Sequence, residues 1–240
     1  MAKKRKKSKK GSFWGFVTLG FLLLILGFGG WKIFQNRYAI RGIDVSHYQG
    51  EIKWEKVKKA DVAFAFVKAT EGISLVDAQY ERNRAQTTEI KLPFGAYHFF
   101  RPSLSGKQQA KHFLKTYKPL KGDLPPVLDL EETDGQSAKK IRKEALAWLK
   151  AVEKSTGVKP IVYTLPHFAS SYLNGALSEY LLWVVDLGWR EPADSKGWKS
   201  WTFWQHKHTG RVPGIKGDVD LNYFNGNLVD FERLRRQKAK

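Results

Sequence analysis

Two acidic residues placed two positions apart carry the sharpest chemical signal in this sequence. Asp129 and Glu131 stand in the run PVLDLE at 126–131, where Leu128 and Leu130 take the alternate positions. Side chains on a β-strand alternate between its two faces, so both carboxyl groups lie on one face with their Cα atoms about 7 Å apart. Like charges this close in a partly dry site raise the pKa of at least one carboxyl. A general acid that works at neutral pH needs that shift.

A structural interpretation of the same pair stays open on spacing alone. Asp129 and Glu131 at a strand end could cap the next helix or form ion pairs with Lys139 or Lys140, and Glu132 is expected to do so. Such roles are common for acidic residues that precede a helix.

Two further carboxylates interrupt apolar runs. Asp44 lies between Ile43 and Val45 in GIDVSHYQG, and Asp220 shows the same alternation in VDLNYF. Each one taken singly could be a hydrogen-bonded structural residue. Four inward carboxylates with few arginines to neutralise them would be costly unless they were used, which favours catalysis.

Aromatic and polar side chains near the same strand ends are predicted to bind substrate. Aromatic rings beside polar strand ends are most often packing residues, but they also form platforms on which sugars stack. The residues predicted to contact substrate are Tyr48, Tyr97, Tyr163, Trp183 and Gln205.

Other chemistries find little support. His47 and His98, with Asp44 and Asp129, could in principle ligate a metal, but the sequence has no HxH or HExxH spacing, and we predict no metal and no cofactor. His98 is expected to be a hydrogen-bonded core histidine. Neither a GxSxG elbow nor a glycine-rich phosphate loop is present.

The elements that must position these residues are short β-branched or aromatic runs. Eight of them occur, at 40–46, 62–70, 94–100, 126–131, 160–164, 181–187, 201–206 and 218–224. Segments of helical character lie between the first five, at 54–60, 77–90, 106–117 and 137–155, whereas the loops after the sixth and seventh runs show no helical period. This alternation predicts an α/β fold, an irregular parallel β/α barrel of eight strands with helices mainly after the first five. The carboxyl ends of its strands would gather the polar residues at one mouth.

Composition supports one folded domain at 41–232. The chain has 240 residues, 42% hydrophobic and 14% aromatic, which excludes a disordered chain. It has no cysteine, so a disulfide scaffold, a thiolate zinc site and a cysteine nucleophile are excluded. The net charge is +19, of which +10 falls after residue 40 and favours acidic polymers or anionic lipid headgroups as partners. A solvated basic surface without a partner is the alternative.

The N-terminal region is organised differently. Seven of the residues at 1–10 are basic, and 11–31 is uncharged and about 31 Å long as a helix. We therefore predict a cytoplasmic tail at 1–10, an uncleaved transmembrane anchor at 11–31, a linker at 32–40 and an exported barrel. A cleaved signal peptide is the main alternative, although no Ala-x-Ala site follows. The basic tail is not interpreted as a nucleic-acid arm, and a second basic tail is expected at 233–240.

Several motifs in order resemble one known family. GIDVSHYQG, FAFVKATEG, FGAYHFFRP, PPVLDLE, PIVYT and GDVDLNYF resemble the glycoside hydrolase family 25 lysozymes over about 41–231. The resemblance implies an irregular α/β barrel and an N-acetylmuramidase that cleaves peptidoglycan glycan strands. We expect a monomer, and the predicted anchor places its barrel outside the cytoplasmic membrane. A glycan-binding barrel without turnover is the alternative.

The resemblance also implies roles for the four carboxylates. Glu131 would be the general acid. Asp129 would stabilise the developing positive charge, either directly or by orienting the N-acetyl group of the substrate as an internal nucleophile. Asp44 and Asp220 would tune these groups or position water. Retaining, inverting and substrate-assisted routes all stay open at this point.

Overall fold

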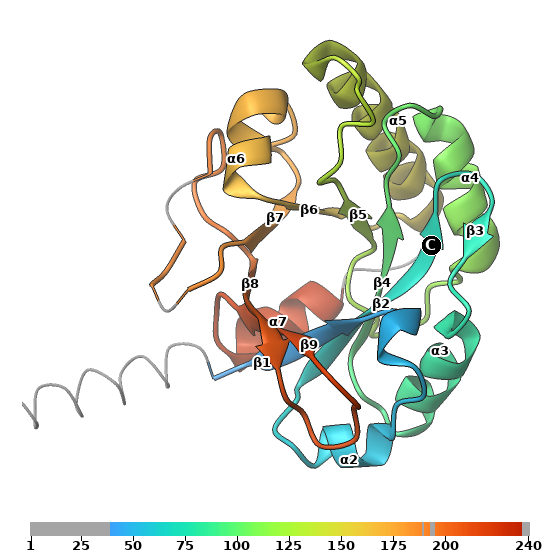
Figure 1. Cartoon of the computed structure of the whole chain (residues 1–240), viewed down its shortest axis with the longest axis vertical. Coiled ribbons are helices and arrows are strands. Elements are labelled where there is room, and N and C mark those ends of the chain that lie inside the picture. Colours follow the sequence, from blue (N-terminus) through green and yellow to red (C-terminus); the bar gives the residue numbers. More distant parts are fainter. Residues whose placement is uncertain (1–38, 189, 193–194, 237–240) are drawn as a thin grey trace, which may run out of the picture. The chain divides into compact units, whose positions relative to one another are not determined.

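The apolar runs of the sequence form one sheet that closes into a barrel. The computed structural model describes residues 39–188, 190–192 and 195–236. Its eight barrel strands are β1 (Arg41–Val45), β2 (Phe64–Glu71), β4 (Phe94–Phe99), β5 (Val127–Asp129), β6 (Ile161–Thr164), β7 (Leu181–Val185), β8 (Phe203–Gly210) and β9 (Val219–Phe224). A two-residue strand, β3 (Leu75–Val76), pairs with the end of β2, and pairing of β1 with β2 closes the ring. Each of the eight expected runs is thus a strand (Figure 1).

The last strand runs opposite to the expected direction. Pairing among the eight barrel strands is parallel from β1 through β8, but β9 is antiparallel to both β8 and β1. The prediction of a wholly parallel barrel is therefore wrong at β9. Residues 211–218 join β8 to β9 without a helix, and so short a connection produces a hairpin, because a parallel crossover needs a dozen or more residues. The N-terminal end of β9 consequently lies at the mouth, where the other strands end.

Helices cover one side of the barrel, as predicted. They are α2 (Trp54–Lys58), α3 (Tyr80–Glu89), α4 (Gly106–Thr116) and α5 (Ala138–Thr156), and Figure 1 shows α3, α4 and α5 outside the strands β2, β4 and β5. The side chain of Ser137 caps the start of α5, and Gly157, with a φ of 73°, ends it in the left-handed conformation that glycine favours.

The other side is irregular. Short turns η1 (His47–Gln49), α6 (Pro166–Phe168) and η2 (Ala169–Leu173) follow β1 and β6, and no helix follows β7 in the described parts of 186–202. The expected loss of helices late in the barrel is confirmed there.

Aromatic side chains fill part of the barrel interior. Phe66 stacks on Trp183 at 4.5 Å between ring centroids, and Phe64 packs edge-on against Phe203 at 5.2 Å. Gly42 makes room for this packing, because a Cβ there would lie 2.3 Å from the ring of Phe64. We call these rings the aromatic plug; it reaches the pocket at the mouth, because Trp183 also lines that pocket.

The structure describes most of the C-terminal end of the chain and little of the N-terminal end. A final helix, α7 (Leu228–Arg235), continues past residue 232, where we expected the barrel to end, and its Leu234 is buried. The expected tail therefore begins as ordered helix; 237–240 lies outside the described residues. The tail at 1–10, the anchor at 11–31 and most of the linker at 32–40 also lie outside them. Within the described ranges, no helix has the length and apolar character needed to cross a bilayer.

Candidate active site

All four predicted carboxylates meet in one pocket at the mouth of the barrel. This open pocket has a volume of about 210 Å³, and Asp44, Asp129, Glu131 and Asp220 line it. Three of them come from the ends of parallel strands or just beyond. Asp220 reaches the same place from the start of β9, because that strand runs the other way.

Asp129 and Glu131 point into the pocket from the end of β5, as strand alternation predicted. Leu128 and Leu130 are fully buried, whereas both carboxyl groups line the pocket. Burial, and next the charge of Glu131, raises the pKa of Asp129 well above its usual value. Burial, with Glu132 and Asp220, also raises the pKa of Glu131. Both groups thus hold a proton to higher pH than an exposed carboxyl does.

One oxygen of Asp129 is unsatisfied. Its Oδ1 is buried and has no hydrogen-bond partner within the described protein. A buried acceptor without a donor is costly, and native proteins tolerate it mainly at functional positions. Since Asp129 lines the pocket, a substrate N–H or O–H is the natural partner.

Asp44 and Asp220 form a second acidic pair across neighbouring strands. They are directly opposite each other in the β1–β9 register. Burial and then the charge of Asp220 raise the pKa of Asp44 well above its usual value, while burial raises the pKa of Asp220 to about 6. Two carboxyls at opposite positions of neighbouring strands resist ionising together, so each holds its proton to higher pH than an exposed carboxyl does.

Asn222 connects Asp44 to the aromatic plug, a role the sequence analysis missed. Its Nδ2 donates to Oδ2 of Asp44 at 2.7 Å, and its Oδ1 accepts from Nε1 of Trp183 at 2.8 Å. Donation to the carboxylate opposes the rise in the pKa of Asp44. The sequence does contain a signal for this role, because Asn222 lies two positions after Asp220 and so faces the same side of β9.

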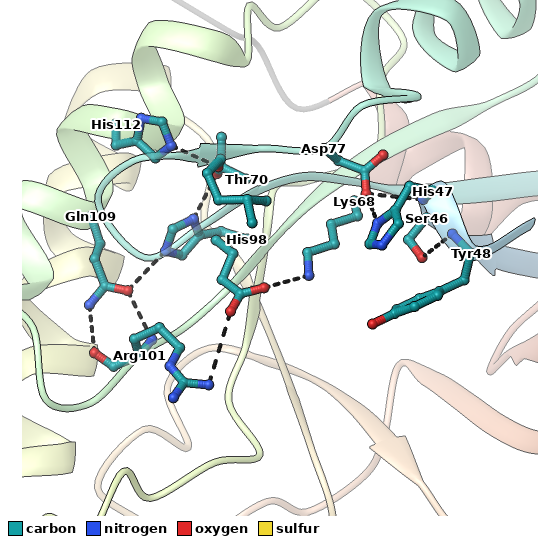
Figure 2. Close-up of polar contacts among 12 residues, drawn as sticks. Ser46, His47, Tyr48, Lys68, Thr70, Asp77, His98, Arg101, Gln109 and His112 are labelled. Atoms are coloured by element: carbon teal, nitrogen blue, oxygen red, sulfur yellow. Dashed lines mark hydrogen bonds and ion pairs between the residues drawn. The ribbon is translucent and has the colours of Figure 1, made fainter. Parts of the chain in front are cut away.

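Lys68 was also missed, although it is the cation of the pocket. Its Nζ lies 2.8 Å from Oε2 of Glu71 and 4.8 Å from the ring centre of Phe99, and only 7% of the residue is exposed. Figure 2 shows this contact as a dashed line from the ammonium group of Lys68. Its charge lowers the pKa of Asp129 and of Glu131, against the effect of burial.

Four of the five predicted substrate-binding residues line the pocket. They are Tyr48, Tyr97, Tyr163 and Trp183. Tyr48 is 83% exposed and sits on η1, so its ring is free to stack on a ligand. Gln205 is the exception: it is buried on β8, is not part of the pocket lining, and its Oε1 has no hydrogen-bond partner among the described residues.

The two histidines considered as metal ligands have other partners. Nδ1 of His98 lies 2.7 Å from Oγ1 of Thr70 and its Nε2 lies 3.1 Å from Oε1 of Gln109, while burial lowers its pKa to about 3. His47 pairs with the buried Asp77 at 2.8 Å (Figure 2). In the part of the chain that the structure describes, no group of three or more acidic or histidine side chains is arranged to hold a metal ion.

A closed α/β barrel whose mouth gathers carboxyl groups of raised pKa beside the aromatic rings that line the pocket is typical of a glycoside hydrolase. Comparison with known proteins supports the same class. The model of the glycosyl hydrolases family 25 matches residues 43–215, and the chain belongs to that family.

Known relatives fit this assignment. Lysozyme M1 of Streptomyces globisporus is 36% identical over 84% of this chain and 73% of its own length. The uncharacterized protein YegX of Escherichia coli K12 is 46% identical over 81% of this chain and 73% of its own. The crystal structure of a bacterial lysozyme from Streptomyces coelicolor superposes with a TM-score of 0.79 and 34% identity, covering 84% of this chain and 99% of that one.

Proposed function

We propose that this protein is a peptidoglycan muramidase that hydrolyses the β-1,4 bond between N-acetylmuramic acid and N-acetylglucosamine. Family membership and the lysozyme relatives support a glycan-hydrolysing activity. The single observation that carries the proposal is the convergence of Asp129, Glu131, Asp44 and Asp220 on one pocket.

Glu131 is the general acid in this proposal. Its raised pKa leaves more of it protonated at a given pH than an exposed glutamate would be, and it lines the pocket where a glycosidic oxygen would enter. It donates its proton to that oxygen as the bond from oxygen to the anomeric carbon breaks. The resulting carboxylate then accepts a proton from the water that completes hydrolysis.

Asp129 acts on the N-acetyl group of the muramic acid. Its unpartnered Oδ1 is an acceptor for the acetamido N–H, which turns the acetamido oxygen toward the anomeric carbon as the internal nucleophile. Formation of this bond places positive charge on the acetamido group. Asp129 stabilises this charge in its ionised form, which the charge of Lys68 favours against the effect of burial, while the proton of the acidic pair rests on Glu131. Asp44 and Asp220 set the electrostatic field beside this reaction and position water.

The N-terminal sequence supports a proposal for where the protein lies in the cell. We propose that 11–31 anchors it in the cytoplasmic membrane with 1–10 in the cytoplasm and the barrel outside, because an uncharged stretch of that length follows a dense basic cluster. A monomer is sufficient, since residues of one chain line the pocket.

The test compares reducing ends released from purified peptidoglycan by the full chain in detergent and by two glutamate variants. Glu131→Gln should lower the rate by about 10²- to 10⁴-fold, the usual contribution of a general acid. Glu89→Gln is the matched control, because Glu89 is exposed at the end of α3 and is not part of the pocket lining, and it should stay within a few-fold of the parent. Equal release by Glu131→Gln and the parent would refute the assignment. Sedimentation with peptidoglycan but no release by the parent would instead favour a binding barrel without turnover.

A further inference from the structure

The end of the barrel opposite the mouth differs from the mouth in the charge of its side chains. Because β1 to β8 are parallel, the segments that precede these strands collect at this end, together with the segment that follows the antiparallel β9. We call it the base, and define it by residues 58–63, 90–93, 117–126, 157–160, 174–180, 195–202 and 225–236. Backbone hydrogen bonds join neighbouring segments around it, for example from Leu124 N to Phe94 O at 2.7 Å and from Asn225 N to Thr202 O at 2.9 Å.

The base is strongly basic. Its seven segments hold eleven lysine and arginine residues against five aspartate and glutamate residues, and nine of the eleven cations are exposed. Four of the five acidic groups already have cationic partners, since Asp123 pairs with Arg84 at 2.8 Å, Asp61 with Arg41, Asp230 with Arg233 and Glu232 with Arg235. The opposite end holds the acidic pocket, so the barrel carries a charge difference along its axis.

Apolar side chains stand among these cations. Leu228 and Val229 at the start of α7 are 66% and 65% exposed, and Leu120 is 49% exposed. The inner face of α7 packs on the barrel core through Phe231, which lies 5.6 Å from the ring of Phe64. Nε of Arg235 donates to the carbonyl of Gly122 at 2.9 Å and holds the segment of Leu120 beside the helix. Exposed leucine and valine surrounded by lysine and arginine are typical of surfaces that lie on anionic lipid.

The chain also enters the barrel at the base. The carbonyl of Ile40 accepts from Phe224 N at 3.0 Å, immediately before α7. The nine residues of the linker at 32–40 span at most about 30 Å when extended. The anchor proposed above at 11–31 therefore joins the barrel through its base end.

We infer that the base docks on the anionic phospholipid headgroups of the membrane. The acidic mouth then faces away from the bilayer, toward the glycan strands. This orientation rests on the proposed anchor and activity, whereas the affinity of the base for anionic lipid rests only on its exposed cations and apolar side chains. Such binding weakens with salt, because the Debye length falls from about 8 Å at physiological ionic strength to about 3 Å at 1 M.

The absence of native cysteine permits a direct test with the full chain. Ser200→Cys places one thiol at the base and Ser74→Cys places one at the mouth, and both serines are exposed. Each variant is labelled with an environment-sensitive fluorophore and reconstituted in vesicles of phosphatidylcholine with or without phosphatidylglycerol. We expect a blue shift and quenching by spin-labelled lipid for the base label in phosphatidylglycerol vesicles only, reversed by high salt. Equal signals from both labels, a stronger signal at the mouth, or no effect of phosphatidylglycerol would overturn the inference.

A second variant tests the named surface. Replacing Lys118, Lys121 and Arg236 by glutamine in the base-labelled protein should remove most of the phosphatidylglycerol-dependent quenching, since each cation near an anionic surface contributes roughly a factor of five in binding. Hydrolysis of peptidoglycan in detergent should be unchanged, because none of the three lines the pocket. Retained quenching would overturn the inference. Fluorescence does not require turnover, so a failure of docking and a failure of the muramidase assignment give different results. Flotation with phosphatidylcholine vesicles reports separately on the anchor.

Discussion

Replacing Asn222 by leucine is the sharpest test of how the site is built. The side chains have similar size, so the change mainly deletes two buried hydrogen bonds, the one to Asp44 at 2.7 Å and the one from Trp183 at 2.8 Å. Asn222 is 1% exposed and Trp183 is equally buried, so water has little access to replace these partners.

The expected loss of stability follows from the groups left unpaired. Each buried group that loses its partner costs about 1–3 kcal/mol, and the apolar leucine offsets part of the sum. We expect Asn222→Leu to lower the free energy of unfolding by about 2–4 kcal/mol. For a domain of this size the melting temperature should fall by roughly 5–15 °C.

The loss should also depend on pH. Burial raises the pKa of Asp44 in the folded protein, so the proton that it retains stabilises the fold at low pH and that stability is lost as the pH rises through the folded pKa. Donation from Asn222 lowers this pKa, and its removal raises it further. The penalty of Asn222→Leu should therefore be larger at pH 8 than at pH 4.

Urea unfolding at the two pH values measures the effect. Gln205→Leu is the matched control, because Gln205 is the register neighbour of Asn222, is also buried, and has an Oε1 without a partner. It should change stability by less than about 1 kcal/mol. A penalty for Asn222→Leu no larger than that of the control, or one that does not change with pH, would refute this account of the site.

Three further predictions concern activity. Lys68→Met should move the whole pH profile of kcat/KM to higher pH, because Lys68 lowers the pKa of Asp129 and of Glu131; an unmoved profile would show that the cation does not act on them. Tyr48→Ala should raise KM about 2- to 12-fold with little change in kcat, as expected for a lost stacking contact on an exposed ring, and a fall in kcat alone would contradict that role. EDTA should leave peptidoglycan hydrolysis unchanged; inactivation reversed by added metal would favour a metal-dependent hydrolase.

Local patterns were sufficient for much of the fold. The eight strands and the helices α3, α4 and α5 correspond to runs read directly from the sequence, because hydrophobic periodicity is a property of a few neighbouring residues. The common orientation of Asp129 and Glu131 is of the same kind, since it depends only on their separation of two positions in a strand.

Other features depend on how the sheet closes. The direction of β9 is set by the short hairpin from β8, and only closure against β1 brings Asp220 opposite Asp44. The exclusion of Gln205 from the pocket has the same origin, because alternation along one strand does not say which side chains a neighbouring strand will cover.

The periodicity of each segment thus specified its type and the face its side chains take, through interactions over a few residues. The meeting of Trp183, Asn222 and Asp44, the placement of Lys68 beside two carboxyls, and the basic base opposite an acidic mouth required the closed barrel. These groups are far apart along the chain, and their contacts depend on strand order, register and direction together.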